Sequence, residues 1–393
     1  MKSTELALHP EEQIREPALY HSLKDIFHFD FVAGLPCGEL RHFIAESRDD
    51  GQVEHLQTTN EREAIGVAQG AWLAGKRPVL YMQNSGLFEA SNDLASLLLP
   101  CKSPILFVVS WRGAPGETAT QHFFTGNATP KLLESFGIPF VTDPDLDNLH
   151  KLAKIMENNS VPGVVLVKRE KFNEQIQPIR RDEAKGRLCP QVIFDRARES
   201  TDLSRETALD ILFQKLIQPG DAVVSSTGLI SRSAFHHHDS DNQFYNAGAF
   251  GVTSSIGLGF ANSRKDIRTI VIEGDGSVLT NLGALNVIAH YANNNFVHVV
   301  LDNQAYVSCS GEPTYGSDKI PNLARELGYG YVSSANDEVN LANATHSLDN
   351  KTNGPKMIHI RINQNGERNF KRPLEMADIA TRFRNKFSQS RGR

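Results

Sequence analysis

The sequence predicts an α/β protein of two domains, each built on a parallel β-sheet flanked by helices. Short runs rich in Val, Ile and Leu alternate with segments of helical periodicity, which is the order that parallel sheets with helices on both faces produce. The chain has 393 residues, and at about 150 residues per domain this length suits two or three domains. The alternation stops once, in a charged stretch that begins near residue 169, and it resumes after residue 205.

The first half of the chain contains three strand candidates and two helix candidates. Strands are expected at 79–83, 104–110 and 163–168, because apolar residues run there without interruption, as in strands covered on both faces. Helices are expected at 61–74 and 88–99, where apolar residues recur every three or four positions.

The second half repeats this pattern. Strands are expected at 221–225, 268–273, 296–301 and 356–362, and helices at 281–291 and 321–327. The predicted division is a first domain over residues 1–170, a linker over 171–205 and a second domain over 206–393. The basic stretch 382–393 is expected to be a solvated chain end.

Composition argues against several functional classes. With 41 basic and 46 acidic side chains the formal charge is −5, which is unfavourable for general binding to nucleic-acid phosphates. No apolar run approaches the roughly 18 residues that cross a bilayer, and residues 1–16 lack the apolar core of a signal peptide. The four cysteines form no CxxC pair, so neither a disulfide framework nor a structural zinc site is predicted. We expect a cytoplasmic protein that binds neither nucleic acid nor membrane.

Three glycine-rich or histidine-rich segments are better explained by packing than by ligand binding. Residues 70–77 resemble a phosphate-binding loop, but the glycines lie between a helix and a strand, and Arg77 replaces the required Ser or Thr. Gly257 and Gly259 lack the third glycine of a dinucleotide fingerprint and fit a packed helix. The histidines at 236–238 are adjacent in a predicted loop, and adjacent residues rarely converge on one metal ion.

The segment Gly274-Asp275-Gly276-Ser277 carries a stronger signal, because it lies between a predicted strand and a helix. Glycines let backbone N–H groups approach an anion at the start of a helix, but Asp275 would repel a bare phosphate. The conflict disappears if Asp275 binds a divalent cation that bridges to a diphosphate. A helix cap is the alternative role for Asp275.

The next predicted strand ends in Asp302-Asn303-Gln304-Ala305. Parallel strands bring their carboxyl ends to the same edge of a sheet, where α/β proteins bind ligands. Asn303 and a nearby backbone carbonyl are therefore candidates for further oxygen ligands of the cation. The alternative is a simple turn at Asn303.

These two segments resemble the signature of thiamine diphosphate enzymes, GDG followed by NN, with Asp302 in place of the first Asn. The resemblance implies two thiamine diphosphate-binding-fold domains, the first binding the pyrimidine ring and the second the diphosphate, with thiamine diphosphate and Mg²⁺ as cofactors. The implied cofactor-binding residues here are Gly274, Asp275, Gly276, Ser277, Asn303 and Ala305. Of these, Asp275, Asn303 and the carbonyl of Ala305 are the implied metal ligands.

Further cofactor contacts follow from the same resemblance. Gly248 takes the place of a residue whose carbonyl binds the aminopyrimidine, and Phe250 the place of the bulky residue that bends the cofactor. Thr227 and Gly228 resemble a loop on the diphosphate side.

The family also has a glutamate that acts on the pyrimidine ring, and Glu61 fits its place. Its neighbour Glu63 is the alternative. Without the resemblance, Glu61 would be interpreted as a helix-start carboxylate stabilised by the helix dipole.

Over most of its length the chain is similar to phosphonopyruvate decarboxylases and, more distantly, to sulfopyruvate decarboxylases, which have no third domain. The matching stretches are 34–37, 81–87, 111–116, 121–122, 231–232 and 311–314. The resemblance implies decarboxylation of 3-phosphonopyruvate to phosphonoacetaldehyde and CO₂, a step of phosphonate biosynthesis. The alternatives are sulfopyruvate decarboxylation, or carboligation on another 2-oxo acid with the same cofactor.

The matching stretches also contain candidate substrate-side residues. Gln121 and His122 are candidates for proton transfer, since His exchanges protons near neutral pH, although a loop hydrogen bond explains His122 equally well. Arg112 is the first candidate to bind a phosphonate tail and Arg232 the second. Ser85 is a further substrate candidate.

The loop after Asn303 departs from the family pattern, which continues with glycine, alanine, His-Asp-Ser and Gly-Gly-Gln-Pro-Thr. The His-Asp pair is absent here, and Glu312 adds a negative charge near the expected substrate pocket. The resemblance implies, in addition, a homodimer or homotetramer with active sites between subunits and a small 2-oxo acid as substrate.

Overall fold

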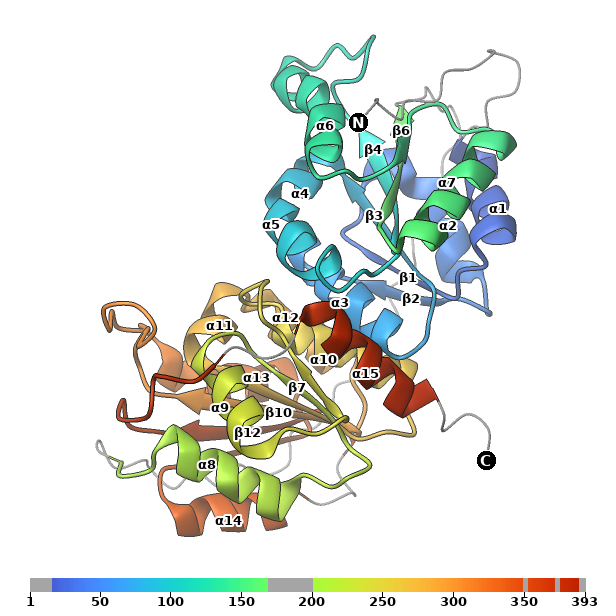
Figure 1. Cartoon of the computed structure of the whole chain (residues 1–393). Coiled ribbons are helices and arrows are strands. Elements are labelled where there is room, and N and C mark those ends of the chain that lie inside the picture. The colour runs from blue at the N-terminus through green and yellow to red at the C-terminus, as the bar shows by residue number, and fades with distance from the viewer. Residues whose placement is uncertain (1–15, 169–200, 349–352, 372–374, 389–393) are drawn as a thin grey trace. The chain divides into compact units, whose positions relative to one another are not determined.

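The structure is a computed structural model that describes residues 16–168, 201–348, 353–371 and 375–388. Contacts divide the chain into two compact units, Met1–Arg181 and Asp182–Arg393, each with one six-stranded parallel sheet (Figure 1). The predicted α/β class is therefore confirmed. Within the described ranges, none of the helices has the length and apolar character needed to span a bilayer. The predicted linker, 171–205, lies mostly outside these ranges, so the domain borders stay predictions.

The sheet of the first unit has the strand order β2-β1-β3-β4-β6-β5. Its strands are β1 (Phe31–Gly34), β2 (Glu54–Gln57), β3 (Pro78–Gln83), β4 (Leu106–Trp111), β5 (Phe140–Val141) and β6 (Gly163–Lys168). The three strands predicted in this half correspond to β3, β4 and β6, which are buried along almost their whole length. Burial on both faces explains why uninterrupted apolar runs marked them.

Helices cover both faces of this sheet. On one face, α1 (Glu16–Phe27), α2 (Arg41–Asp49) and α7 (Leu146–Asn159) share an apolar core with the strands. The other helices, among which Figure 1 shows α4 and α6 on the opposite side, are α3 (Glu61–Leu73), α4 (Asn84–Glu89), α5 (Ser91–Asp93) and α6 (Phe123–Ser135). The single helix predicted at 88–99 is wrong in detail, because α4 begins earlier and the chain is interrupted at Ala90 before α5 and a wider turn at Leu94–Leu98.

The sheet of the second unit has the strand order β11-β12-β10-β9-β7-β8, and all its pairs are parallel. Its strands are β7 (Ala222–Ser225), β8 (Gln243–Tyr245), β9 (Thr269–Gly274), β10 (Phe296–Asp302), β11 (Tyr331–Ala335) and β12 (Lys356–Arg361). After β7 the chain runs outward to β8 and then returns to β9 on the other side of β7. Such a reversal leaves a crevice at the carboxyl edge of the sheet, between β7 and β9.

The helices of the second unit again form two layers. The helices α8 (Arg205–Ile211) and α14 (Glu338–His346) join one apolar core of the sheet. The remaining helices are α9 (Leu229–His238), α10 (Thr253–Ser263), α11 (Asp275–Thr280), α12 (Gly283–Tyr291), α13 (Ile320–Leu327) and α15 (Met376–Ser388). The strands and helices predicted in this half all exist, with borders shifted by one or two residues.

The chain end is the clearest error of the sequence analysis. Residues 382–388 belong to α15 and are not a solvated tail; residues 389–393 lie outside the described ranges. Phe383 is fully buried and packs edge-on against Phe244 and Phe260, while Arg382 forms an ion pair with Asp239. Basic residues on the outer face concealed the apolar stripe of this amphipathic helix.

The three segments that the sequence analysis explained by packing are 70–77, 257–259 and 236–238. The segment 70–77 does lie between α3 and β3, and a Cβ at Gly257 in α10 would lie 2.1 Å from the Val271 side chain, so close packing requires that glycine. The histidines at 236–238 form the last turn of α9, which corrects the predicted loop. In the described part of the chain no group of three His, Cys, Asp or Glu residues could hold a metal ion.

Candidate cofactor site

A pocket lies at the carboxyl edge of the second sheet, formed by the segments that follow β7, β9, β10 and β12. It includes nine of the residues predicted to bind the cofactor: Thr227, Gly228, Phe250, Gly274, Asp275, Gly276, Ser277, Asn303 and Ala305. Gly248 is not among the lining residues. Segments distant in sequence are thus brought together in one unit of the protein, at the crevice that the strand order creates.

Two of the pocket glycines have a structural reason, one in its backbone conformation and the other in close packing. Gly228, which precedes the first residue of α9, has φ 85° and ψ −137°, a backbone conformation that residues other than glycine rarely adopt. A Cβ at Gly276 would lie 2.4 Å from the ring of Tyr306, so glycine allows Tyr306 to pack directly on the first turn of α11. Glycine at these two positions therefore permits the backbone conformation before α9 and the close packing at the start of α11.

Asp275 is the first residue of α11 and is only 4% exposed. Thr314 Oγ1 donates a hydrogen bond to its carboxylate at 2.5 Å. Burial, together with the nearby charge of Asp302, raises the pKa of Asp275 to about 7. Among the described residues it forms no ion pair with a Lys, Arg or His, so its charge is uncompensated within this unit.

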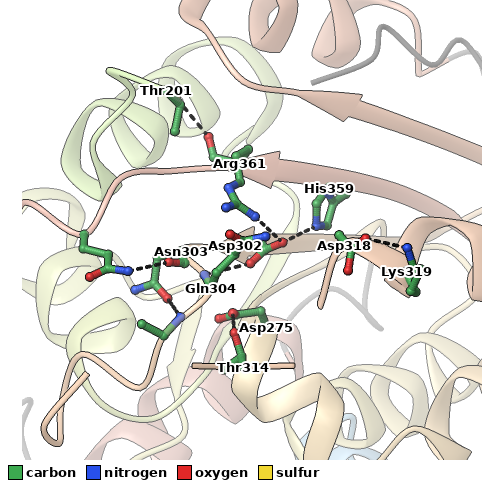
Figure 2. Close-up of polar contacts among 12 residues, drawn as sticks. Thr201, Asp275, Asp302, Asn303, Gln304, Thr314, Asp318, Lys319, His359 and Arg361 are labelled. Atoms are coloured by element: carbon green, nitrogen blue, oxygen red, sulfur yellow. Dashed lines mark hydrogen bonds and ion pairs between the residues drawn. The ribbon is translucent and has the colours of Figure 1, made fainter. Parts of the chain in front are cut away.

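Asp302, at the end of β10, is also buried but is held by several donors (Figure 2). Its carboxylate accepts hydrogen bonds from His359 Nε2 at 3.0 Å and Arg361 Nη1 at 3.3 Å, both on β12, and from the Gln304 backbone N–H at 2.9 Å. Although burial acts to raise its pKa, the hydrogen bond and charge of His359, the side-chain interaction with Asp275 and the charge of Arg361 together lower the pKa of Asp302 to about 2. Asp302 therefore carries its charge with local compensation, unlike Asp275.

The turn that follows orients the other proposed ligands. Gln304 has φ 58°, a left-handed conformation that is uncommon outside glycine, and the Asp302 carboxylate bonds to its N–H. Asn303 Oδ1 accepts the Ala305 N–H at 3.0 Å, and the Asn303 carbonyl accepts Gln364 Nε2 at 3.3 Å (Figure 2). Ala305 pairs with Pro313 in an isolated bridge that closes the loop. Asp302 thus stabilises the turn that carries Asn303 and Ala305.

The donor atoms in this pocket fit Mg²⁺. A buried carboxylate, an amide oxygen and a backbone carbonyl are hard oxygen ligands, and Mg²⁺ prefers such oxygens while keeping several of its waters. A divalent cation beside Asp275 would also offset the one carboxylate of this edge that lacks a positive partner among the described residues.

The loop that departs from the family pattern contributes Tyr306, Val307 and Ser308 to the pocket. Glu312 does not line it; its exposed carboxylate accepts the Ser310 N–H at 3.1 Å, and its own carbonyl accepts the Tyr306 N–H at 2.8 Å. The added negative charge therefore closes a turn at the surface and does not enter the pocket.

The first unit distinguishes Glu61 from Glu63. Glu63 accepts both the N–H and the hydroxyl of Thr59, each at 2.8 Å, while Asn60 accepts the Glu63 N–H, so Glu63 caps the start of α3. Glu61 is 7% exposed and no side chain of the described residues bonds to it; burial raises its pKa. A Cβ at Gly86 would lie 2.0 Å from Glu61 Oε1, so the glycine leaves room for this carboxylate.

The other substrate-side candidates lie at the carboxyl ends of the neighbouring strands β3 and β4. Asn84 joins the two ends, because its side chain bonds to both the N–H and the carbonyl of Arg112. Arg112 Nε donates to Glu117 at 2.8 Å, and Glu39 lies 4.0 Å from the same guanidinium. Ser85 is exposed and accepts Gln83 Nε2 at 2.6 Å.

The two proton-transfer candidates follow this loop, in a short turn at Thr120–His122. Gln121 is exposed and His122 half-buried. A Cβ at Gly113, which has φ 78°, would lie 1.9 Å from the His122 carbonyl, so Gly113 allows the turn to pack against the end of β4. The structure thus groups Gln121 and His122 with the candidates that follow β4.

Two models of thiamine pyrophosphate enzymes match the chain, thiamine pyrophosphate being another name for thiamine diphosphate. The N-terminal thiamine pyrophosphate-binding domain matches residues 16–131, and the C-terminal one matches residues 226–359. The chain belongs to the thiamine pyrophosphate enzyme family. Glu61 lies within the first match, and Asp275 and Asn303 within the second.

Individual relatives narrow the comparison. The chain is 34% identical to a phosphonopyruvate decarboxylase of Streptomyces viridochromogenes over 90% of both chains, and 32% identical to one of Streptomyces hygroscopicus over 90% of this chain and 89% of the relative. It is 29% identical to a sulfopyruvate decarboxylase of Methanosarcina acetivorans over 72% of this chain and 75% of the relative. In fold it resembles a 4-hydroxybenzoylformate decarboxylase of Rhodococcus jostii, with a TM-score of 0.68 at 11% identity, covering 90% of this chain and 100% of that one.

Sequence reasoning missed His359, Arg361 and Thr314 as supports of this family site. A signal existed for the first two, because they lie at the end of the strand predicted at 356–362, and this end should lie beside other strand ends of a parallel sheet. Which strand would neighbour β10, however, is decided by the strand order, and that order cannot be read from one sequence.

Replacing Arg361 should reveal its charge coupling to Asp302. Arg361→Met should lower the free energy of unfolding by about 1–3 kcal/mol, because a buried carboxylate loses one of its donors. In an Asp302→Asn background the same change should cost less than about 1 kcal/mol, since a neutral amide needs no counter-ion. Urea unfolding of the four proteins measures this coupling. Equal costs in both backgrounds would contradict it, and Arg325→Met, at an exposed ion pair with Glu326, serves as the control.

Metal binding should depend on pH through Asp275. Because the pKa of this carboxyl is raised to about 7, protons compete with the cation below that pH. The apparent Mg²⁺ dissociation constant should rise about tenfold per pH unit as the pH falls below about 7, and it should level off above. Calorimetric Mg²⁺ titrations at several pH values measure this slope. A flat profile would contradict the account, and Asp275→Asn should remove the slope together with most of the affinity.

Proposed function

We propose that this protein decarboxylates 3-phosphonopyruvate to phosphonoacetaldehyde and CO₂ with thiamine diphosphate and Mg²⁺. The observation that carries the proposal is the similarity over 90% of the chain to two phosphonopyruvate decarboxylases. In its second unit, nine of the residues predicted to bind the cofactor line one pocket. This activity is that of a carboxy-lyase. CO₂ loss would also draw forward a preceding step that forms the carbon–phosphorus bond.

When bound, thiamine diphosphate supplies a carbanion nucleophile and an electron sink for the electrons that remain after CO₂ departs. In this proposal Asp275, Asn303 and the Ala305 carbonyl hold Mg²⁺, and the glycine turns at 227–228 and 274–277 admit the diphosphate. Phe250 and Gly248 orient the ring portion of the cofactor. These residues bind and orient, and none of them has to form a covalent bond.

Glu61 is the proposed proton partner of the pyrimidine ring. Its burial raises the pKa of the Glu61 carboxyl and so favours the protonated form, and Gly86 leaves the space in which the carboxyl lies. Gln121 and His122 are proposed to move protons on the substrate side, because an imidazole can both accept and donate near neutral pH.

Arg112 is the proposed cation for the phosphonate tail, with Arg232 second and Ser85 as an additional contact. A guanidinium can bind two phosphonate oxygens at once. Glu117 already occupies Nε of Arg112, so only the remaining nitrogens of the fork are available to a substrate.

Sulfopyruvate is the second candidate substrate, supported by the similarity to the Methanosarcina enzyme. Its sulfonate tail carries one negative charge, whereas a phosphonate carries up to two, so a single arginine would suffice. We further propose that the protein acts in the cytoplasm as a homodimer or homotetramer in which each active site uses two subunits.

The substrate is tested by incubating the protein with phosphonopyruvate, thiamine diphosphate and Mg²⁺ and recording phosphorus NMR spectra. The proposal predicts a phosphonoacetaldehyde signal that disappears when either cofactor is omitted. Unchanged phosphonopyruvate together with CO₂ release from sulfopyruvate would assign the second substrate. No turnover of either acid by folded, cofactor-loaded protein would contradict both.

Replacing the two glutamates of α3 should separate catalysis from folding. Glu61→Gln should lower kcat by at least about 100-fold, because proton exchange with the pyrimidine is lost, and it should leave Mg²⁺-dependent cofactor binding within a few-fold. Glu63→Gln is the matched control: it should lower the free energy of unfolding by about 1 kcal/mol through the weakened cap, with kcat nearly unchanged. Full activity of Glu61→Gln, or the reverse pattern, would contradict the assignment.

Replacing Arg112 should affect substrate binding and not cofactor binding. Arg112→Ala should raise KM for phosphonopyruvate by about tenfold or more, as expected for the loss of a charge-assisted hydrogen bond, without changing the cofactor dissociation constant. Glu117→Gln removes the competing charge and should leave KM equal or lower. An unchanged KM in Arg112→Ala would shift the proposal to Arg232.

A further inference from the structure

A chain of buried polar groups runs from the interior of the second unit to the cofactor pocket. Ser277 Oγ donates to Glu273 Oε1 at 2.6 Å, His298 Nε2 lies 3.2 Å from Glu273 Oε2, and His298 Nδ1 lies 3.3 Å from the Tyr329 hydroxyl. Glu273, His298 and Tyr329 are fully buried, and Ser277 is 2% exposed. Of the four, Ser277 alone lines the pocket.

The strands bring these groups together. Glu273 lies on β9 two residues before Asp275, and His298 lies on the neighbouring strand β10, opposite Val271. Tyr329 follows the left-handed turn at Gly328 that ends α13. Central strands of parallel sheets are normally apolar, so a glutamate and a histidine at this depth contrast with their surroundings.

Packing of the core alone does not require a glutamate at position 273 or a histidine at position 298. A buried carboxylate must be desolvated, and apolar side chains of similar size usually stabilise a core as well or better. In this network Tyr329 contacts His298, and His298 contacts Glu273, each within hydrogen-bond distance. Glu273 in turn accepts a hydrogen bond from the hydroxyl of Ser277, which lines the pocket. The network therefore fixes the direction of one hydrogen bond at the site.

We propose that Glu273 and His298 are positioning residues of the cofactor site, which act by holding the Ser277 hydroxyl proton away from the pocket. Ser277 then presents to the pocket a backbone N–H and an oxygen that can only accept. Such an oxygen suits a hydrogen-bond donor, and water bound to Mg²⁺ is one, whereas a bare phosphate oxygen is not. The inference rests on the proposed binding of thiamine diphosphate and Mg²⁺ by this pocket.

The test is a double-mutant cycle on cofactor binding. The dissociation constant of thiamine diphosphate is measured by calorimetry in Mg²⁺ for wild type, Glu273→Gln, Ser277→Ala and the double variant. Each single change should weaken binding about tenfold, since one hydrogen bond that orients the site is lost. The double variant should be no weaker than Ser277→Ala within about twofold, because Glu273 acts through Ser277.

Controls separate this role from folding. Tyr245→Phe removes another buried hydroxyl–carboxylate bond of the same unit, to Asp239, and should leave the dissociation constant unchanged. Glu273→Asp keeps a carboxyl group at this position but shortens its reach to Ser277. It replaces Glu273→Gln if that variant does not fold, and it should weaken binding similarly. Losses that multiply in the double variant, or wild-type affinity in both Glu273 variants, would overturn the inference alone. Failure of the wild-type protein to bind the cofactor would overturn the proposed function as well.

Discussion

The buried carboxylate of Asp275 is the constraint around which the second unit is organised. Three carboxylates lie near the carboxyl edge of this sheet, on Glu273, Asp275 and Asp302, and all are almost or fully inaccessible to water. Glu273 has His298 as its partner, and Asp302 has His359 and Arg361. Of the three, Asp275 alone has no basic partner among the described residues; its carboxyl group interacts with the Thr314 hydroxyl, the Gly276 backbone and the neighbouring Asp302. A cation at this place would give Asp275 a positively charged partner beside its buried carboxyl group.

The backbone supports the same arrangement. Asp302 accepts a hydrogen bond from the N–H of Gln304 and so stabilises a left-handed turn at a residue other than glycine. That turn carries Asn303 and Ala305, the two oxygen donors proposed beside Asp275. The left-handed conformation of Gln304 is unfavourable for a residue other than glycine, and the hydrogen bond to the Asp302 carboxylate compensates for it. Asp302 in turn is held by His359 and Arg361 on β12. Asp302 and Gln304, two residues that depart from the pattern expected of the family, are therefore joined by a hydrogen bond.

The sequence was sufficient for the fold class, because it depends on short-range patterns, and nine of the residues predicted to bind the cofactor, by motif and by resemblance, line the pocket. Long buried strands such as β3 and β10 were marked by their apolar runs, whereas β5 and β8, of two and three residues, have too little sequence to show a period. The Asp302 and Glu273 networks could not be predicted, because they depend on which strands are neighbours. The helix at the chain end was missed for another reason, since its basic face outweighed its apolar stripe.

The proposed substrate is supported by the similarity to phosphonopyruvate decarboxylases and by Arg112, which already forms an ion pair with Glu117. Binding of the cofactor is therefore the better first measurement. Thiamine diphosphate is titrated calorimetrically into the wild-type protein with Mg²⁺, into the same protein with EDTA, and into Asp275→Asn with Mg²⁺. The account predicts tight binding in the first titration and a loss of at least about tenfold in affinity in the other two. Equal affinity in all three would contradict the central claim that Asp275 holds the metal that anchors the cofactor.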